Sequence, residues 1–201
     1  MKLPELHFGD SIAQLPIIQG GMGVGISLSG LASAVANEGG VGVIAAAMIG
    51  MSEPDVGSNS TEANIRALRN EIRKAKERMT QGLLGVNIMV ALTNFADLVK
   101  TSVREGADVI FVESPQSEAE LDTVGRAFPG VPLLANMVEG GRTPILPAAR
   151  LQALGYRLAI YPNALTRLFA KAGLEMLASL KETGSSNAMA PRMLSHGELW
   201  T

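Results

Sequence analysis

Short apolar runs alternate along this chain with longer segments of helical periodicity, and this alternation limits the fold more than any other feature. Glycine, proline, serine or asparagine usually separates an apolar run from the helical segment that follows it. That rhythm is typical of parallel βα units. The runs that we expect to be strands are residues 15–19, 41–47, 83–90, 107–113, 132–138 and 157–161. The sequence therefore predicts an α/β protein of about six βα units.

The expected strands are continuously apolar, as the run VGVIAA at residues 41–46 illustrates. Strands of this kind are buried on both faces, which a doubly wound sheet and a barrel both provide. A complete βα barrel has eight strands. Six strands leave three arrangements open: a tightly closed barrel, an open sheet, or a sheet completed by a second copy. We expect one TIM-barrel-like domain over residues 1–201.

Helix-capping signals mark several of the segments between the strands. Ser27 or Ser29 is the expected N-cap of the first long helix, which the glycines at 39–40 end. Ser117, followed three residues later by Glu120, has the pattern of a capping box. The charged segment at residues 61–79 is expected to be a solvated outer helix. Three further helices are expected at residues 94–105, 146–154 and 164–182.

The charge and the rare residue types exclude several classes of protein. A net charge of −2 gives no sign of a nucleic-acid or anionic-membrane partner. Cysteine is absent, which removes disulfides and thiolate metal sites, and only His7 and His196 supply imidazole. The first residues form no apolar signal segment, and no apolar run approaches the length of a membrane span. We expect a cytoplasmic protein that binds neither nucleic acid nor membrane.

The N-terminal half carries three glycine-containing motifs. They are PIIQGGMG at residues 16–23, GVGVI at 40–44 and GVNIM at 85–89. Through these motifs residues 1–111 resemble the nitronate monooxygenases, the flavin-dependent family once called 2-nitropropane dioxygenases. The resemblance implies FMN as the cofactor, with Gly20, Gly21 and Met22 contacting the flavin ring through the backbone and Asn87 through its side chain. Glycine permits such close backbone approach, and an amide side chain both donates and accepts hydrogen bonds.

The C-terminal half carries the motifs of a different family. They are GADVIFVES at residues 106–114, PLLANMVE at 132–139, GRTP at 141–144 and LAIYP at 158–162. Through them residues 106–201 resemble the isocitrate lyase/phosphoenolpyruvate mutase superfamily, and methylisocitrate lyases in particular. The resemblance implies that these strands are the sixth to eighth of a barrel. It also implies that Glu113 and Asn136 line a substrate pocket at the strand ends.

The two resemblances change over at residues 106–111, which fit the fourth strand of one family and the sixth of the other. Such a join removes two βα units from eight and leaves six. We interpret the chain as an engineered or recombined chimera. Residues 1–106 are its nitronate-monooxygenase-like fragment, and residues 107–201 are its isocitrate-lyase-like fragment.

Each fragment lacks part of the machinery that its resemblance implies. The flavin family's phosphate-binding loops and catalytic histidine have no match after Phe111. The lyase family's acidic magnesium ligands give way to Gln19, Ala47 and Asn87 at the first strand ends. We therefore expect a scaffold without efficient catalysis, and we assign no catalytic residue and no metal site. Two alternatives stay open: a weakly FMN-binding flavoprotein with nitronate monooxygenase-type activity, and a residual magnesium-dependent lyase.

Unpaired parallel strand edges favour association with another chain. The lyase-like family also exchanges its C-terminal helix between subunits, and residues 174–200 resemble that region. We therefore expect the protein to form a homo-oligomer.

Overall fold

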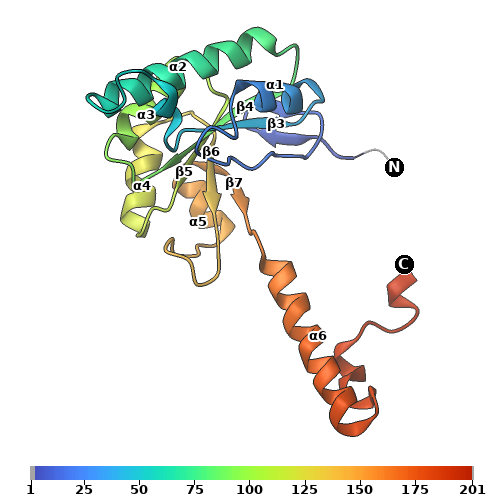
Figure 1. The fold of residues 1–201 in the computed structure, drawn as a ribbon. Coiled ribbons are helices and arrows are strands. Elements are labelled where there is room, and N and C mark those ends of the chain that lie inside the picture. Colours follow the sequence, from blue (N-terminus) through green and yellow to red (C-terminus); the bar gives the residue numbers. More distant parts are fainter. Residues whose placement is uncertain (1–2, 201) are drawn as a thin grey trace. The chain divides into compact units, whose positions relative to one another are not determined.

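The computed structural model describes residues 3–200 of the chain (Figure 1). Contacts divide it into two compact units, the first ending at Ile160 and the second beginning at Tyr161. The first unit holds the parallel sheet and the candidate site. The second unit consists of a long helix and the turns that follow it.

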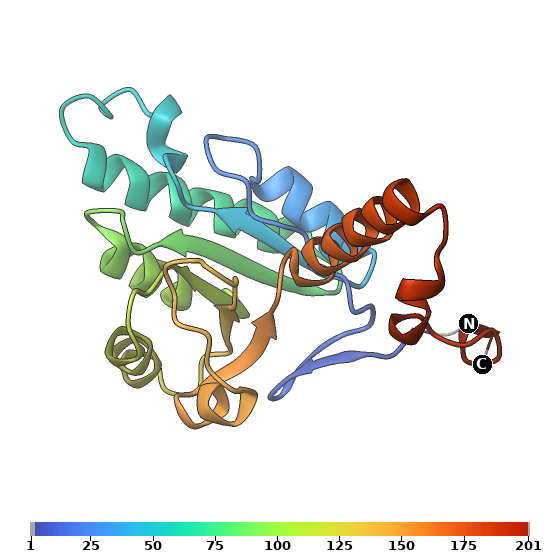
Figure 2. The same ribbon diagram turned by 90° about the horizontal axis from the view of Figure 1, so that it is seen from below.

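Five parallel strands form the sheet of the first unit, and their spatial order equals their order along the chain (Figures 1 and 2). They are β3 (Val41–Ala45), β4 (Leu83–Met89), β5 (Val109–Glu113), β6 (Leu133–Asn136) and β7 (Tyr156–Ile160). The helices between them are α1 (Ser29–Asn37), α2 (Ser60–Arg78), α3 (Phe95–Arg104), α4 (Glu118–Ala127) and α5 (Ala148–Ala153), with a 3-10 turn η1 (Ile49–Ser52). The predicted α/β class with parallel βα repeats is confirmed. Among the described residues β3 and β7 stand at the two ends of the sheet order, so the sheet is open.

The first expected strand, residues 15–19, is reduced to a single bridge between Ile18 and Val41. Backbone bonds join Val41 N to Ile17 O at 2.9 Å and Gln19 N to Val41 O at 3.0 Å. The ladder stops there because Val43 N donates to the side-chain Oε1 of Gln19, at 2.9 Å, instead of to a backbone carbonyl. The prediction of a full strand at this place is therefore wrong.

A short antiparallel hairpin, which was not predicted from the sequence, precedes the sheet. Its strands are β1 (Leu6–Phe8) and β2 (Ser11–Ala13), joined by Gly9 and Asp10. Gly9 has a φ of 63°, the left-handed conformation that tight hairpin turns require. Phe8 and Ala13 are buried in a cluster with the first residues of β3, β4 and β5. The hairpin thus closes the amino-terminal end of the sheet's inner face.

The sheet packs differently on its two faces. Its outer face meets the helices in a large cluster that includes Ile44, Leu84 and Ile110 from strands and Leu68 and Leu98 from helices. The inner face, which includes Val43 and Leu134, forms the smaller cluster with the hairpin. β3 is buried along its whole length, as its uninterrupted apolar sequence predicted. Helix α1 approaches β3 closely, because a Cβ on Gly42 would lie only 1.8 Å from Ala32 O.

One of the two helix-capping predictions is confirmed, and the other is wrong. Ser117 does cap α4, since its Oγ accepts from Glu120 N at 3.1 Å. Neither Ser27 nor Ser29 caps α1 through its side chain. Instead, Ser29 N donates to the Glu71 carboxylate of α2 at 2.9 Å. A long-range contact has replaced the local cap that the sequence indicated.

The second unit contains α6 (Ala164–Thr183), followed by the 3-10 turns η2 (Asn187–Arg192) and η3 (Glu198–Trp200). None of the residues of α6 is buried. Within the described part of the chain, no helix has the length and apolar character needed to cross a bilayer.

Candidate functional site

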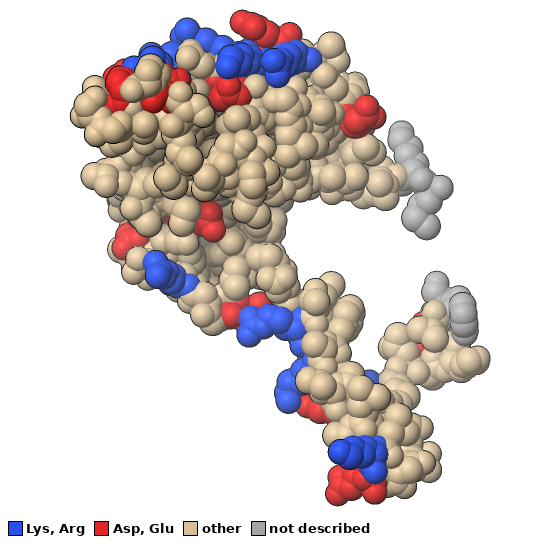
Figure 3. Space-filling view, viewed as in Figure 1, with Lys and Arg blue, Asp and Glu red and all other residues tan. Residues whose placement is uncertain are grey.

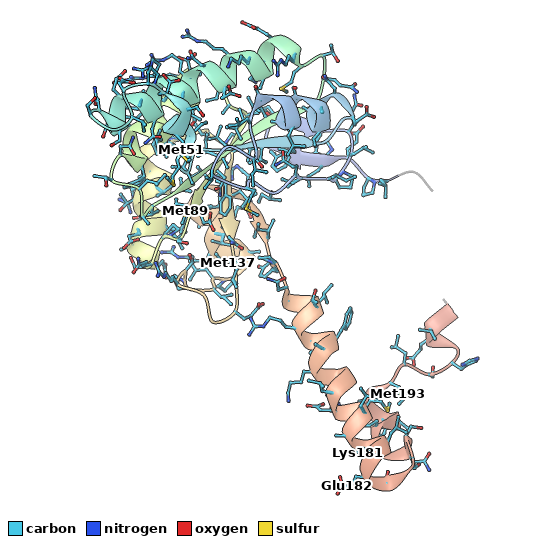
Figure 4. All side chains as sticks on the ribbon, viewed as in Figure 1. Met51, Met89, Met137, Lys181, Glu182 and Met193 are labelled. Atoms are coloured by element: carbon cyan, nitrogen blue, oxygen red, sulfur yellow. The ribbon has the colours of Figure 1, made fainter. Side chains whose placement is uncertain are left out.

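The carboxyl ends of β4, β5 and β6 bring three polar side chains to the inner face of the sheet. Side chains two residues apart on a strand face the same side. Asn87, Glu113 and Asn136 each lie two residues beyond a residue of the inner face, namely Gly85, Phe111 and Leu134. Met51, Met89 and Met137, which follow β3, end β4 and follow β6, locate this edge in Figure 4.

Asn87 and Glu113 are in direct contact. Asn87 Nδ2 donates to Glu113 Oε2 at 3.2 Å. Asn136 stands on the other side of Glu113, because Phe111 pairs with Leu134 and both strands continue two residues farther. Adjacent strands are about 4.8 Å apart, so the three side chains form one row. The Oδ1 atom of Asn136 is shielded from solvent and accepts no hydrogen bond within the described residues.

A glycine loop, residues 20–25, covers the same edge beside Asn87 and is fixed by a compact polar network. Gln19 Nε2 donates to Ser27 Oγ at 3.0 Å, while Gln19 Oε1 accepts from Val43 N. Ser27 Oγ also accepts from Met22 N at 2.9 Å. Buried Ser27 and the Gln19 amide therefore hold the loop in one conformation.

Gly21 packs directly on Asn87. A Cβ at Gly21 would lie 2.9 Å from Asn87 Cβ, closer than real Cβ atoms approach, and 3.2 Å from Val43 Cγ1, a tight contact. A Cβ at the neighbouring Gly20 would meet nothing within 4 Å. The backbone N–H groups of Gly20 and Gly21 donate to no other described residue. Two backbone donors are thus available to a ligand next to the amide of Asn87.

Below this polar edge lies an apolar cavity of about 140 Å³. Its lining runs from Ile18 at one side of the sheet to Ile160 at the other, so the inner face is concave. The remaining lining residues are Gln19, Gly20, Gly21, Val41, Val43, Gly85, Val86, Val109, Phe111 and Leu134. Cavities for whole drug-sized ligands are typically about 300–1,000 Å³. This one has room for part of a planar ring and not for a complete nucleotide cofactor.

The residues fit the two ends of FMN unequally. The ring end fits, because backbone donors, a donor–acceptor amide and an apolar wall meet there. The phosphate end lacks an equivalent grip near the ring, since Glu113 and Asn136 Oδ1 present acceptor oxygens. The loop after β6 contains Gly140, whose φ is 74°, and the exposed Arg142. Arg142 is the basic residue of that loop, and its part in phosphate binding can be tested by mutation.

Five of the six residues selected from the sequence are brought to one edge: Gly20, Gly21 and Asn87 from the N-terminal fragment, and Glu113 and Asn136 from the C-terminal one. Met22 differs, because its N–H is taken by Ser27 and its side chain is 61% exposed. Gln19 and Ser27, which position the loop, were not among the predicted site residues. A glutamine directly before two glycines was the available signal.

Charged side chains are distributed unevenly over the face of the first unit that Figure 3 shows. In the view of Figure 3 they gather over α2, whereas the part of the unit below α2 shows mostly uncharged side chains. Within the described residues, no three His, Cys, Asp or Glu side chains are grouped as a metal site would require.

Comparisons with known proteins find both families. The model of the nitronate monooxygenase family matches residues 8–123, more than half of the chain. The chain is also 43% identical over 93 residues to a 2,3-dimethylmalate lyase of Eubacterium barkeri, and 39% identical over 98 residues to a 2-methylisocitrate lyase of Bacillus subtilis. These matches cover 46% and 49% of this chain and 32% of each relative. The chain therefore spans about a third of the length of these curated relatives.

Solved structures resemble the chain in fold. A crystal structure of 2,3-dimethylmalate lyase, a member of the PEP mutase/isocitrate lyase superfamily, superposes with a TM-score of 0.55 and 26% identity. It covers 63% of this chain and 46% of that protein. An oxaloacetate acetylhydrolase structure also gives a TM-score of 0.55 at 23% identity, covering 63% of this chain and 44% of that one. These neighbours are barrel-like, which agrees with the TIM-barrel-like prediction.

Proposed function

The chain belongs to the nitronate monooxygenase family by its match over residues 8–123, and from this premise we propose that it is a composite βα protein that binds a flavin ring and has no efficient turnover. The observation that carries the proposal is the close packing of Gly21 on Asn87, where a Cβ added to Gly21 would lie 2.9 Å from Asn87 Cβ. This contact lies beside the hydrogen bond between Asn87 and Glu113. One fragment supplies the backbone donors of the site, and the other supplies its acceptors.

The donor and acceptor pattern supports a planar heteroaromatic ligand. An isoalloxazine ring carries carbonyl and ring-nitrogen acceptors, for which the Gly20 and Gly21 N–H groups are the matching donors. Its ring N–H is a donor, for which Asn87 Oδ1 is a matching acceptor, since Asn87 uses its Nδ2 to donate to Glu113. Apolar side chains such as Val43 and Phe111 provide the surface for the ring face.

The expected lack of efficient turnover rests on the positions of the available bases. His7 lies in β1, in the hairpin at the amino-terminal end of the sheet, whereas the candidate site lies at the carboxyl ends of the strands. Glu113 is the carboxylate beside the ring site, and it already accepts from Asn87. A well-positioned general base typically contributes about 10²–10⁴-fold to a rate. We expect flavin-loaded protein to oxidise alkyl nitronates slowly.

An absorbance spectrum tests the proposal. Purified protein is incubated with excess riboflavin or FMN, desalted, and scanned across the visible flavin bands. We expect the wild type to retain flavin and Asn87→Leu to lose it while keeping the same circular dichroism spectrum. A wild-type protein that melts cooperatively but retains neither flavin contradicts the flavin-binding part of the proposal.

The relatives favour a second candidate, a lyase of 2,3-dimethylmalate or a similar acid. Its support is the 43% identity to the Eubacterium barkeri lyase and the placement of Glu113 and Asn136 at adjacent strand ends. Cleavage of 2,3-dimethylmalate, measured with and without magnesium, tests it. Turnover that Glu113→Gln abolishes supports the lyase, and turnover that Glu113→Gln leaves unchanged contradicts it.

The chimeric origin, the cytoplasmic location and the homo-oligomeric state remain predictions. The similarity to two families within one chain supports the first of them. Mass measurement, described below, tests the oligomeric state.

A further inference from the structure

The acceptor-rich edge of the flavin site raises the question of which form of flavin it takes. We infer that the site selects flavins without a phosphate, so that riboflavin binds more tightly than FMN. This inference rests on the proposed flavin-ring site and names the ligand class of that site.

The shape of the cavity sets the direction in which the ribityl chain of a bound flavin leaves it. At its amino-terminal end the inner face is closed by the hairpin, where Phe8 and Ala13 pack against Val41, Leu83 and Val109. A ring in the cavity therefore points its ribityl chain toward the carboxyl edge. That edge carries the row Asn87, Glu113 and Asn136.

That row presents hydrogen-bond acceptors to a ligand. Glu113 presents a carboxylate, and the amide of Asn87 already donates to it at 3.2 Å. Asn136 Oδ1 is shielded from solvent and accepts no hydrogen bond within the described residues. A buried acceptor without a donor is destabilising, so a ligand that donates a hydrogen bond to Asn136 Oδ1 would be favoured. The hydroxyl groups of a ribityl chain are hydrogen-bond donors and match both acceptors.

A phosphate group at the same place would be disfavoured. A phosphate monoester carries a charge of about −1.5 to −2 at pH 7 and presents only acceptor oxygens when fully ionised. Beside Glu113 it meets a like charge, and beside Asn136 Oδ1 it meets a second acceptor. Like charges placed close together at a partly buried site repel each other, and added salt weakens this repulsion without abolishing it.

A basic residue, Arg142, lies in the loop after β6, and its positive charge would attract a phosphate. It is exposed, and the neighbouring Gly140 adopts a left-handed conformation suited to a tight turn. If Arg142 grips a phosphate, the preference reverses.

Flavin fluorescence titrations test the inference, with lumiflavin, riboflavin and FMN as probes that share one ring system. We expect FMN to bind at least tenfold more weakly than riboflavin, and lumiflavin to bind severalfold more weakly than riboflavin. Glu113→Gln should reduce the difference between FMN and riboflavin to less than threefold. Glu77→Gln, which removes the same charge from the exposed face of α2, should leave it unchanged.

A salt titration of the wild type gives the same test without a variant. Raising the ionic strength should strengthen FMN binding relative to riboflavin, because it screens the repulsion. FMN binding equal to or tighter than that of riboflavin overturns the inference but leaves the flavin-ring site standing. If Arg142→Ala then removes the FMN advantage, the loop is a phosphate grip. Failure of all three probes to bind overturns the proposed function as well.

Discussion

Gly20 and Gly21 are adjacent in the sequence but meet different surroundings in the fold. Gly21 is the point where the glycine loop touches Asn87 and Val43, while a Cβ on Gly20 would enter open space. The sequence motif predicted that both glycines matter. Only the structure distinguishes a glycine required by packing from one that leaves a backbone group accessible.

This difference predicts opposite outcomes for two alanine variants. Gly21→Ala must displace Asn87 or the loop, and overpacking of this kind typically costs about 1–3 kcal/mol. Gly20→Ala should change the free energy of unfolding by less than about 0.5 kcal/mol. Urea denaturation of both variants measures these values. Equal stability of the two variants would show that Gly21 and Asn87 are not in contact.

The site residues were predictable from the sequence because they stand at strand ends. Asn87, Glu113 and Asn136 are polar residues in the carboxyl-terminal halves of apolar runs, and parallel strands present their carboxyl ends on one edge. The network of Gln19 and Ser27 was not predictable in the same way. It depends on a hydrogen bond from Val43 N to the side-chain Oε1 of Gln19 in place of a backbone carbonyl, and no local sequence pattern indicates this hydrogen bond.

At the level of elements, the sequence predicted the long helices and central strands well. Helix α2 and strands β3 and β4 lie within two residues of their expected bounds. The hairpin β1–β2 was missed because each strand has only three residues. Its signal was Gly9-Asp10 between two short runs, a pair that favours a two-residue hairpin turn. The cap of α1 was missed because it comes from Glu71, 42 residues away from Ser29.

The Glu71 contact gives a pH-dependent prediction. Burial raises the pKa of Glu71, but hydrogen bonds from Ser29 and the Lys74 ammonium outweigh it and hold that pKa below its usual value of 4.5. A carboxyl group whose folded pKa is depressed stabilises the fold above its unfolded pKa, and this contribution is lost as the pH falls. Glu71→Gln should cost about 0.5–2 kcal/mol at pH 7, the range of helix-cap losses.

The difference between the wild type and Glu71→Gln should shrink as the pH falls below about 4.5, where the wild-type carboxyl group also becomes neutral. Thermal melts from pH 3 to pH 7, roughly spanning that transition, measure it. Glu77→Gln on the same helix is the control, because Glu77 is exposed. A stability difference that stays constant with pH would exclude a role for the Glu71 charge.

On the scale of the whole molecule, the chain leaves apolar surface without a partner among its described residues. Helix α6 exposes Leu165, Leu168, Phe169, Leu174 and Leu177 by 61–69% each. The sheet of the first unit is open at β7. Large exposed apolar areas and open strand edges usually mark association surfaces.

These surfaces predict a solution mass that is a multiple of the 21.1 kDa chain. Light scattering coupled to size-exclusion chromatography measures that mass. Replacing Leu168 and Phe169 with serine should shift the distribution toward the monomer, because both side chains are more than 60% exposed in the single chain. A wild-type protein that is monomeric at all concentrations would contradict the prediction.

The central claim is that residues from two family-like fragments form one ligand site. Fluorescence titration of riboflavin against the wild type, Asn87→Ala and Asn136→Ala tests it most directly, since each variant removes one fragment's contribution. We predict saturable binding by the wild type and a loss of about five- to thirtyfold in each variant, equivalent to about 1–2 kcal/mol per lost hydrogen-bonding group. No saturable binding by the wild type, or a loss in only one variant, would contradict the claim.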